Sequence, residues 1–226
     1  MSGAQPARAQ ARAAAVAVDG WLNDAQGAAL FDAAAGCSGR GAIVEIGSWK
    51  GRSTIWLGYG ARLAGQPVFA VDPHEHSRED PSARTLDEFT ENIRRAGVAD
   101  VVKPLVMTSR AAAASFDGGV EILFIDGDHS ETGAEQDAAA WFPRLIEGAT
   151  VLLHDVVTAS YTGPRKVFRR HICWSSGFAG VRRIGSMGVA QRAAQRSRSE
   201  AIRGTVAGFM LYVLDVKRVL RKVWKP

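Results

Sequence analysis

The sequence contains only two cysteines, Cys37 and Cys173, among its 226 residues. Two cysteines cannot form a cysteine-ligated zinc motif or a disulfide framework, so we expect a reducing, cytoplasmic environment. Long hydrophobic runs are also missing. The longest uncharged apolar stretch near the C-terminus, residues 204–214, has 11 residues, whereas a membrane-spanning helix needs about 20. The N-terminus is rich in alanine but lacks an apolar run of the signal-peptide type, which disfavours secretion.

The charge is divided between a mildly acidic body and a basic tail. The net charge is +5, yet residues 192–226 carry nine basic and two acidic side chains, a local balance of +7 that leaves −2 for residues 1–191. The sequence also lacks a zinc finger, an RNP-type aromatic strand and a helix-turn-helix pattern, so we expect no nucleic acid partner. Contents of 46% hydrophobic and 23% charged residues are typical of one globular domain.

Hydrophobic patterning predicts an α/β fold. From residue 42 onward, short runs rich in β-branched residues alternate with helical patterns. Such alternation indicates βαβ units, so we expect a doubly wound, mostly parallel sheet of the Rossmann-like type. The expected strands are residues 42–46, 67–71, 101–106, 120–125 and 149–153, and the expected helices are residues 21–35, 53–63, 84–96, 109–116, 131–145 and 164–174.

The pattern changes after the fifth strand. Two short runs at residues 181–184 and 187–191 flank Gly185-Ser186, which predicts an antiparallel hairpin at the edge of the sheet. We divide the chain into a flexible leader at residues 1–20, a domain at residues 21–191, and a tail at residues 192–226. The leader is either frayed or a loosely docked helix.

The tail is predicted to form a linker followed by a basic amphipathic helix over residues 200–224. Such a helix can lie on an anionic membrane, here the inner face, or dock on the body or on a second subunit, and these alternatives stay open, as does a homo-oligomer. The apolar stripe of this helix is Ile202, Val206, Phe209, Met210, Val213, Val216, Leu220 and Val223.

Polar residues follow every expected strand of the parallel sheet. In open α/β sheets, ligands bind beyond the carboxyl ends of the strands. Four of the five ends carry a carboxylate, which stability alone does not require, so we expect a ligand site there. The five ends are Glu45-Ile46-Gly47-Ser48, Asp72-Pro73-His74, Met107-Thr108-Ser109, Asp126-Gly127-Asp128-His129 and His154-Asp155.

The first loop has the sequence EIGSWKGRS, residues 45–53. A dinucleotide fingerprint needs G-x-G-x-x-G, but Trp49 stands at the second glycine position and Glu45 would repel a phosphate. An acidic residue before a glycine turn suits a cation such as an ammonium or a sulfonium. Asp72 follows at the spacing where an acidic side chain typically holds ribose hydroxyls. The alternatives are an ordinary strand–helix turn and a capping Asp, and Ser109 either bonds the adenine or caps a helix.

The segments VEIGSWKGRST, FAVDPH, IDGDHS and LLHD resemble class I S-adenosylmethionine-dependent methyltransferases, most closely the bacterial branch that contains sugar and antibiotic O-methyltransferases. The resemblance implies methyl transfer from S-adenosylmethionine to a hydroxyl of a small molecule, such as a sugar or natural product. It further implies that Glu45, Gly47 and Gly51 line the methionine part of this cofactor and that Asp72 binds its ribose. The complete expected cofactor set is Glu45, Gly47, Ser48, Gly51, Ser53, Asp72, Pro73, Ser109 and Asp126.

The ends of the fourth and fifth strands carry carboxylates that suit Mg²⁺, and a bound cation would lower the pKa of an acceptor hydroxyl. Related catechol-type methyltransferases have an Asp after the fourth strand and an Asp-Asn pair after the fifth. Asp126 and Asp155 match this pattern, but Val156 replaces the Asn. Either Asp128 or His154 then supplies the third ligand, or no metal is bound. The expected metal set is Asp126, Asp128, His154 and Asp155.

His129 stands three residues after Asp126, where the related enzymes have a catalytic Lys. Because histidine titrates near neutral pH, His129 is a candidate general base for the hydroxyl. The expected catalytic set is Asp126, His129 and His154. Two other functions stay open: a hydroxylase of the same fold that uses the acidic strand ends for iron, and a non-catalytic cofactor-binding module.

Overall fold

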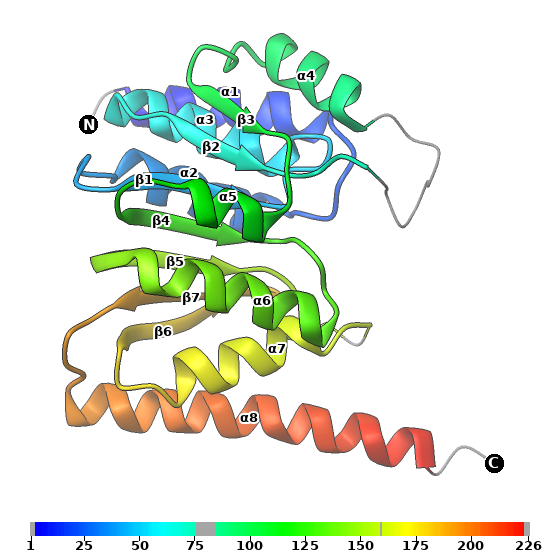
Figure 1. The fold of residues 1–226 in the computed structure, drawn as a ribbon, viewed down its shortest axis with the longest axis vertical. Coiled ribbons are helices and arrows are strands. Elements are labelled where there is room, and N and C mark those ends of the chain that lie inside the picture. The colour runs from blue at the N-terminus through cyan, green and yellow to red at the C-terminus, as the bar shows by residue number, and fades with distance from the viewer. Residues whose placement is uncertain (1–2, 76–84, 159, 224–226) are drawn as a thin grey trace.

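The computed structural model describes residues 3–75, 85–158 and 160–223, with side chains described as far as Lys217. Seven strands form one sheet in the order β3-β2-β1-β4-β5-β7-β6, with helices on both faces (Figure 1). Strands β1 to β5 are parallel, and β7 runs antiparallel to both β5 and β6. The predicted α/β fold, with a mostly parallel sheet and a C-terminal antiparallel hairpin, is confirmed.

The strands are β1 (Ala42–Ile46), β2 (Val68–Val71), β3 (Val102–Leu105), β4 (Val120–Ile125), β5 (Leu145–Leu153), β6 (Phe178–Ile184) and β7 (Met187–Arg192). The helices are α1 (Ala4–Val16), α2 (Asp24–Ala35), α3 (Arg52–Ala64), α4 (Thr85–Arg95), α5 (Ser109–Ser115), α6 (Glu131–Trp141), α7 (Gly163–Val167) and α8 (Arg198–Val223), with a short 3₁₀ turn η1 (Phe142–Arg144) and a π-helical turn η2 (Phe168–Cys173).

Two hydrophobic cores lie on opposite faces of the sheet because side chains alternate along each strand. Ile43 of β1 packs in the core shared with α1, α2 and α3, whereas Val44 packs in the core beneath α5 and α6. Both faces of β4 are buried along its whole length. This two-sided burial explains why the central strands are nearly continuous apolar runs in the sequence.

Several boundaries differ from the prediction for local reasons. Helix α6 ends at Trp141 rather than at residue 145, because Pro143 cannot continue an α-helix and the chain turns through η1. Strand β5 therefore begins at Leu145 rather than at residue 149. Strand β6 begins at Phe178 rather than at residue 181. The predicted helix limits at residues 84 and 224 lie outside the described residues.

The predicted leader contains a helix docked on the body. Helix α1 packs against α3, and Ala11 and Ala15 are buried in that contact. Small side chains let the two helices approach closely. The segment between α1 and α2 then passes beside the carboxyl ends of the strands, where it contributes Trp21 to the cavity described below.

Helix α8 packs along η2 and β6, at the edge of the sheet farthest from α1 (Figure 1). Gly204, Gly208 and Leu211 are buried in this contact. The predicted apolar stripe is on another side of the helix: Phe209 and Met210 are largely exposed. Among the described helices, none is both long enough and apolar enough to cross a membrane.

Candidate active site

A cavity of about 1110 Å³ opens at the carboxyl ends of β1, β2, β4 and β5. Its wall includes residues that follow each of these strands, together with the start of α5 and one face of α6. The predicted site residues that line it are Gly47, Ser48, Ser53, Asp72, Pro73, Ser109, Asp126, Asp128, His129, His154 and Asp155. Among the described lining residues, Glu45 and Gly51 are absent.

The first loop is shaped by its glycines. Gly47 has φ +86°, and a Cβ at this position would collide with the backbone of Asp126 and Gly127, so the glycine lets the loop after β1 approach the loop after β4. Gly51 has φ +91° and precedes α3, where a Cβ would press on Phe89 and Ile93. Gly47 is therefore required by the packing of the chain itself, and Gly51 is favoured by its positive φ.

Glu45 lies behind this loop rather than at the cavity surface. The side chain is fully buried, and its Oε2 accepts a hydrogen bond from the Thr54 hydroxyl at 2.5 Å. Oε1 has no hydrogen-bond partner among the described residues. Burial raises the pKa of Glu45 to about 7, because the nearby hydroxyls of Ser53 and Thr54 offset the desolvation only in part. The role predicted for Glu45 beside the methionine part of the cofactor stays a prediction, since this side chain is not among the described lining residues.

Asp72 lies at the cavity wall, where it holds two backbone segments. Its Oδ2 accepts a hydrogen bond from the Trp49 N–H at 2.9 Å, and its Oδ1 accepts one from the His74 N–H at 2.8 Å. Trp49 has φ +43° and His74 has φ +54°, conformations that few non-glycine residues adopt. Each carboxylate oxygen keeps a lone pair that can accept a further hydrogen bond from a ligand hydroxyl.

The end of β3 differs in detail from the prediction. Thr108, rather than Ser109, caps α5 by accepting a hydrogen bond from the Ala111 N–H at 3.3 Å. Ser109 instead accepts a hydrogen bond from Trp141 Nε1 at 3.0 Å. Sequence reasoning missed Asp137, a buried carboxyl on α6 that also lines the cavity. Its position on the buried face of α6, one turn before Trp141, is a signal that could have identified it.

The environment of Asp137 favours its neutral form. Burial raises its pKa to about 6, and the nearby charge of Asp128 adds to this effect, while a hydrogen bond with Ser109 opposes it. A carboxyl group that is neutral over part of the physiological range can donate as well as accept a hydrogen bond.

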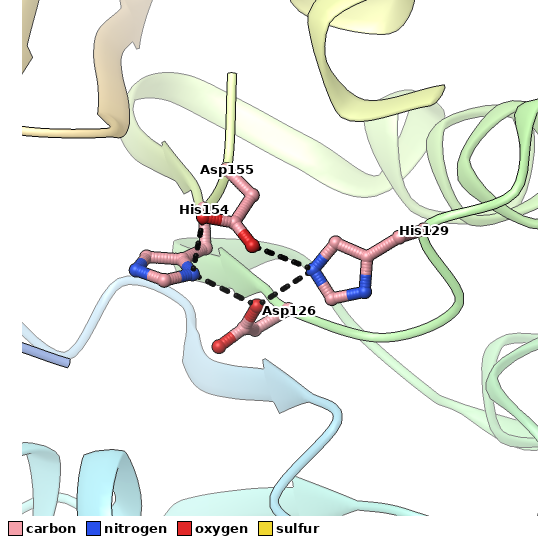
Figure 2. Close-up of side chains that lie close together, drawn as sticks. All are labelled: Asp126, His129, His154 and Asp155. Carbon is pink, nitrogen blue, oxygen red and sulfur yellow. Dashed lines mark ion pairs between the residues drawn. The ribbon is translucent and has the colours of Figure 1, made fainter. Parts of the chain in front are cut away.

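Four side chains from the loops after β4 and β5 converge on one point (Figure 2). His129 Nε2 lies 3.3 Å from an Asp126 oxygen and 3.3 Å from an Asp155 oxygen. His154 Nδ1 lies 3.1 Å from Asp126 Oδ1 and 3.5 Å from Asp155 Oδ1. One ligand atom from each of the four lies within 4.8 Å of the others. We call this group the His/Asp cluster.

The electrostatics of the His/Asp cluster are strongly coupled. Burial disfavours the charged form of His129, but Asp126 and Asp155 outweigh it and raise the pKa of the ring to about 9. The same balance raises the pKa of His154. Burial would raise the pKa of Asp126, yet the two imidazoles hold it at about 2.

Asp128 does not belong to this cluster, although the sequence suggested it as a ligand. Its Oδ1 accepts a hydrogen bond from the Ser130 N–H and its Oδ2 one from the Ser130 hydroxyl, both at 2.8 Å. Ser130 in turn caps α6 by accepting from the Gly133 N–H. Of the two alternatives for the third ligand, His154 lies in the cluster and Asp128 does not, and His129, which the sequence predicted as a base, is the fourth member.

The His/Asp cluster fits a divalent cation. The Nε2 atom of His129 is buried and faces two carboxylates, yet among the described residues it makes no well-aligned hydrogen bond. Such an arrangement is expected of ligands directed at a common centre rather than at each other. Asp155, which supplies one of these carboxylates, has φ +56°, a backbone conformation that few non-glycine residues adopt.

Aromatic rings border the cavity on two sides. Trp21 stacks on Trp49 with ring centroids 5.1 Å apart, and Tyr161 stacks on His129 at 4.5 Å. Arg52 donates hydrogen bonds to the carbonyls of Val18 and Gly20 at 3.1 Å and so fixes the segment that carries Trp21. No pattern in the sequence indicates that Trp21 and Tyr161 line the same cavity.

Comparison with known proteins identifies the domain. Residues 44–156 match the methyltransferase domain family, and this range contains all four residues of the His/Asp cluster. Catechol O-methyltransferase of Mycobacterium tuberculosis (strain ATCC 25618 / H37Rv) is 32% identical over 117 residues, which are 51% of this chain and 48% of that protein. The chain therefore spans about half the length of the curated relative that it matches.

Solved structures share the fold at lower identity. The cofactor-bound protein Rv0187 from MTB is 22% identical with a TM-score of 0.61, over 85% of this chain and 91% of that one. The O-methyltransferase TomG from Streptomyces achromogenes, solved in complex with SAM, is 20% identical with a TM-score of 0.59, over 83% and 90% of the two chains. The match over half of the sequence, together with this shared architecture, shows that the chain belongs to the methyltransferase domain family.

Proposed function

We propose that this protein transfers the methyl group of S-adenosylmethionine to a hydroxyl of a small molecule, assisted by a divalent cation. One observation carries the proposal: a single cavity is lined both by the loop after β1, which Asp72 holds through the Trp49 N–H, and by the His/Asp cluster. Membership of the methyltransferase domain family supports the reaction class, and the catechol O-methyltransferase relative supports oxygen as the methyl acceptor.

The cofactor would occupy the side of the cavity formed by the ends of β1, β2 and β3. The free lone pairs of Asp72 suit ribose hydroxyls, and the start of α5 beside Ser109 suits the adenine. The methionine part would then lie along Gly47 and Ser48, next to Asp126. In this order the sulfonium methyl would face the side of the cavity that holds the His/Asp cluster.

A cation would be held by Asp126, His129, His154 and Asp155. When bound, it would lower the pKa of the acceptor hydroxyl and orient that oxygen toward the methyl group. The sequence pointed to Mg²⁺, but two imidazoles beside two carboxylates suit Mn²⁺, Fe²⁺ or Zn²⁺ better, because Mg²⁺ prefers oxygen ligands.

The protein's own groups would position the acceptor, and the acceptor proton would pass to solvent when the cation is bound. The base role predicted for His129 belongs to a cation-free site and requires a neutral ring, whereas beside Asp126 and Asp155 the ring is protonated at neutral pH. The flat faces of Trp21 and Tyr161 would bound a small acceptor that contains a ring, such as a sugar or an aromatic compound.

Calorimetry and transfer assays on the full chain test the proposal. We expect S-adenosylmethionine to bind, and labelled methyl to appear on a member of a hydroxyl library that contains catechols and sugars, with Mn²⁺ more effective than Mg²⁺ and activity lost in EDTA. Asp126→Asn should abolish cation binding. Asp128→Asn is the matched control, because it removes a neighbouring carboxylate that lies outside the cluster and keeps an oxygen for Ser130.

The outcomes separate the competing functions. Full activity in chelator would refute the cation, and failure of S-adenosylmethionine to bind would refute the methyltransferase. Iron-dependent oxygen consumption with 2-oxoglutarate would favour a hydroxylase. Cofactor binding without turnover on the library would favour a binding module.

A further inference from the structure

We propose that the outward face of helix α8 binds the surface of an anionic membrane. The face consists of Ile202, Val206, Phe209, Met210 and Val216, which are between 37% and 65% exposed. We call this set the α8 stripe. The proposal concerns a surface that the methyl-transfer chemistry does not use, and it stands or falls independently of the proposed function.

The α8 stripe is exposed because the helix docks through its other side. Gly204 and Gly208 lie against η2, where a Cβ would collide with the backbone of Cys173 or the ring of Trp174. Leu211 completes the buried side. With 3.6 residues per turn, positions 204, 208 and 211 lie about half a turn away from positions 202, 206 and 209. The small side chains therefore face the body, and the large apolar ones face outward.

An ion-pair anchor fixes this orientation. Asp215 lies on the inward side of α8, where its Oδ1 pairs with Arg165 Nη1 at 3.0 Å and its Oδ2 pairs with Arg169. Both arginines are almost fully buried. Since two buried cations hold Asp215, the helix cannot rotate to cover the α8 stripe without leaving those charges unpaired.

Charge identifies the occupant of the stripe. Arg203 and Lys217 are exposed, and by helical spacing both lie on the side of the stripe that carries Met210. The sequence after Lys217 adds Arg218, Arg221, Lys222 and Lys225, so the segment from residue 192 carries +7 against −2 for the rest. A second copy of the chain docked on the stripe would bring two such basic segments together. An anionic lipid surface instead offers both an apolar layer and opposite charge.

Vesicle co-sedimentation of the full chain tests this inference. We expect binding to vesicles rich in phosphatidylglycerol, much weaker binding to pure phosphatidylcholine vesicles, and loss of binding as salt is raised. The double variant F209Q/M210Q should weaken binding by at least about ten-fold, because it removes two apolar side chains from the contact. V16Q/L63Q is the matched control, since it replaces two exposed apolar residues on α1 and α3.

A second pair of variants tests the electrostatic part. R203Q/K217Q should weaken binding by about five-fold for each charge removed at low salt, whereas R40Q/K103Q, which removes two exposed charges elsewhere, should have no effect. Circular dichroism and thermal melts establish that every variant is folded.

Three results would overturn the inference: no sedimentation with anionic vesicles, binding that F209Q/M210Q leaves unchanged, or a dimer in lipid-free solution that this variant dissociates. The last result would assign the α8 stripe to a second copy of the chain.

Discussion

The buried carboxyl of Glu45 gives a pH dependence of stability that a single substitution should remove. Glu45 is enclosed between β1 and α3, with the Thr54 hydroxyl as a partner for one oxygen and no partner among the described residues for the other. Desolvation raises its pKa from 4.5 to about 7. Between these values the folded protein retains a proton that the unfolded chain has lost, so the free energy of unfolding falls as pH rises through this window.

The magnitude follows from the two pKa values. At about 1.4 kcal/mol for each pH unit, the difference between the two pKa values corresponds to about 3 kcal/mol of unfolding free energy. This contribution is fully present below pH 4.5 and lost above about pH 7. Glu45→Gln keeps a carbonyl for Thr54 but cannot ionise. The difference in unfolding free energy, variant minus wild type, should therefore increase by about 3 kcal/mol from pH 4.5 to pH 8, whatever its value at low pH.

Urea denaturation at several pH values measures this difference, and Glu121→Gln is a control of opposite sign. Glu121 is also buried, but it accepts hydrogen bonds from the N–H groups of Ser38, Arg40 and Gly41 at 2.8 to 3.2 Å. These bonds outweigh burial and lower its pKa. Glu121→Gln should thus be most destabilising above pH 4.5 and less so as pH falls. A pH-independent difference for Glu45→Gln would refute the reasoning.

Gly47→Ala should lower the free energy of unfolding by about 2–4 kcal/mol in urea denaturation, because the new methyl group collides with the backbone of Asp126 at positive φ. Asp215→Ala should cost about 3–5 kcal/mol by the same measurement, and adding Arg169→Met should restore part of the loss by removing an unpaired buried cation. Asp72→Ala should weaken S-adenosylmethionine binding in calorimetry by at least about ten-fold, because it removes the expected ribose acceptor and frees two backbone N–H groups.

The central strands were predictable because a strand that is buried on both faces requires apolar residues at consecutive positions. The limits of β1 and β4 agree with the prediction. Strand β5 was predicted four residues too short, since Glu147 and Gly148 are exposed and interrupt the hydrophobic run. The pairing of β4 with β5 shifts register between Val120 and Ile122, an irregularity that no local pattern reveals.

The candidate site was predictable at the level of loops but not of individual side chains. Adjacent parallel strands β4 and β5 necessarily bring Asp126 and Asp155 to one edge. The sequence left the third ligand open between Asp128 and His154. In the structure Asp128 accepts two hydrogen bonds from Ser130, which caps α6, whereas His154 lies beside Asp126 in the cluster. An Asp two residues before a helix-capping Ser is itself a recognisable turn signal.

A shared arginine connects the tail to the candidate site, and this connection decides how the α8 stripe must be tested. Arg165 pairs with Asp215 of α8 and also donates to the carbonyls of Val156 at 3.2 Å and Tyr161 at 3.4 Å. Val156 follows Asp155 directly, and the ring of Tyr161 stacks on His129, so Arg165 holds the chain on both sides of the His/Asp cluster. Deleting α8 would leave Arg165 without its carboxylate and disturb that loop, so lost activity after truncation would not distinguish a membrane role from a structural one. Substitutions in the exposed stripe leave the arginine and its partners in place, and they alone separate the two.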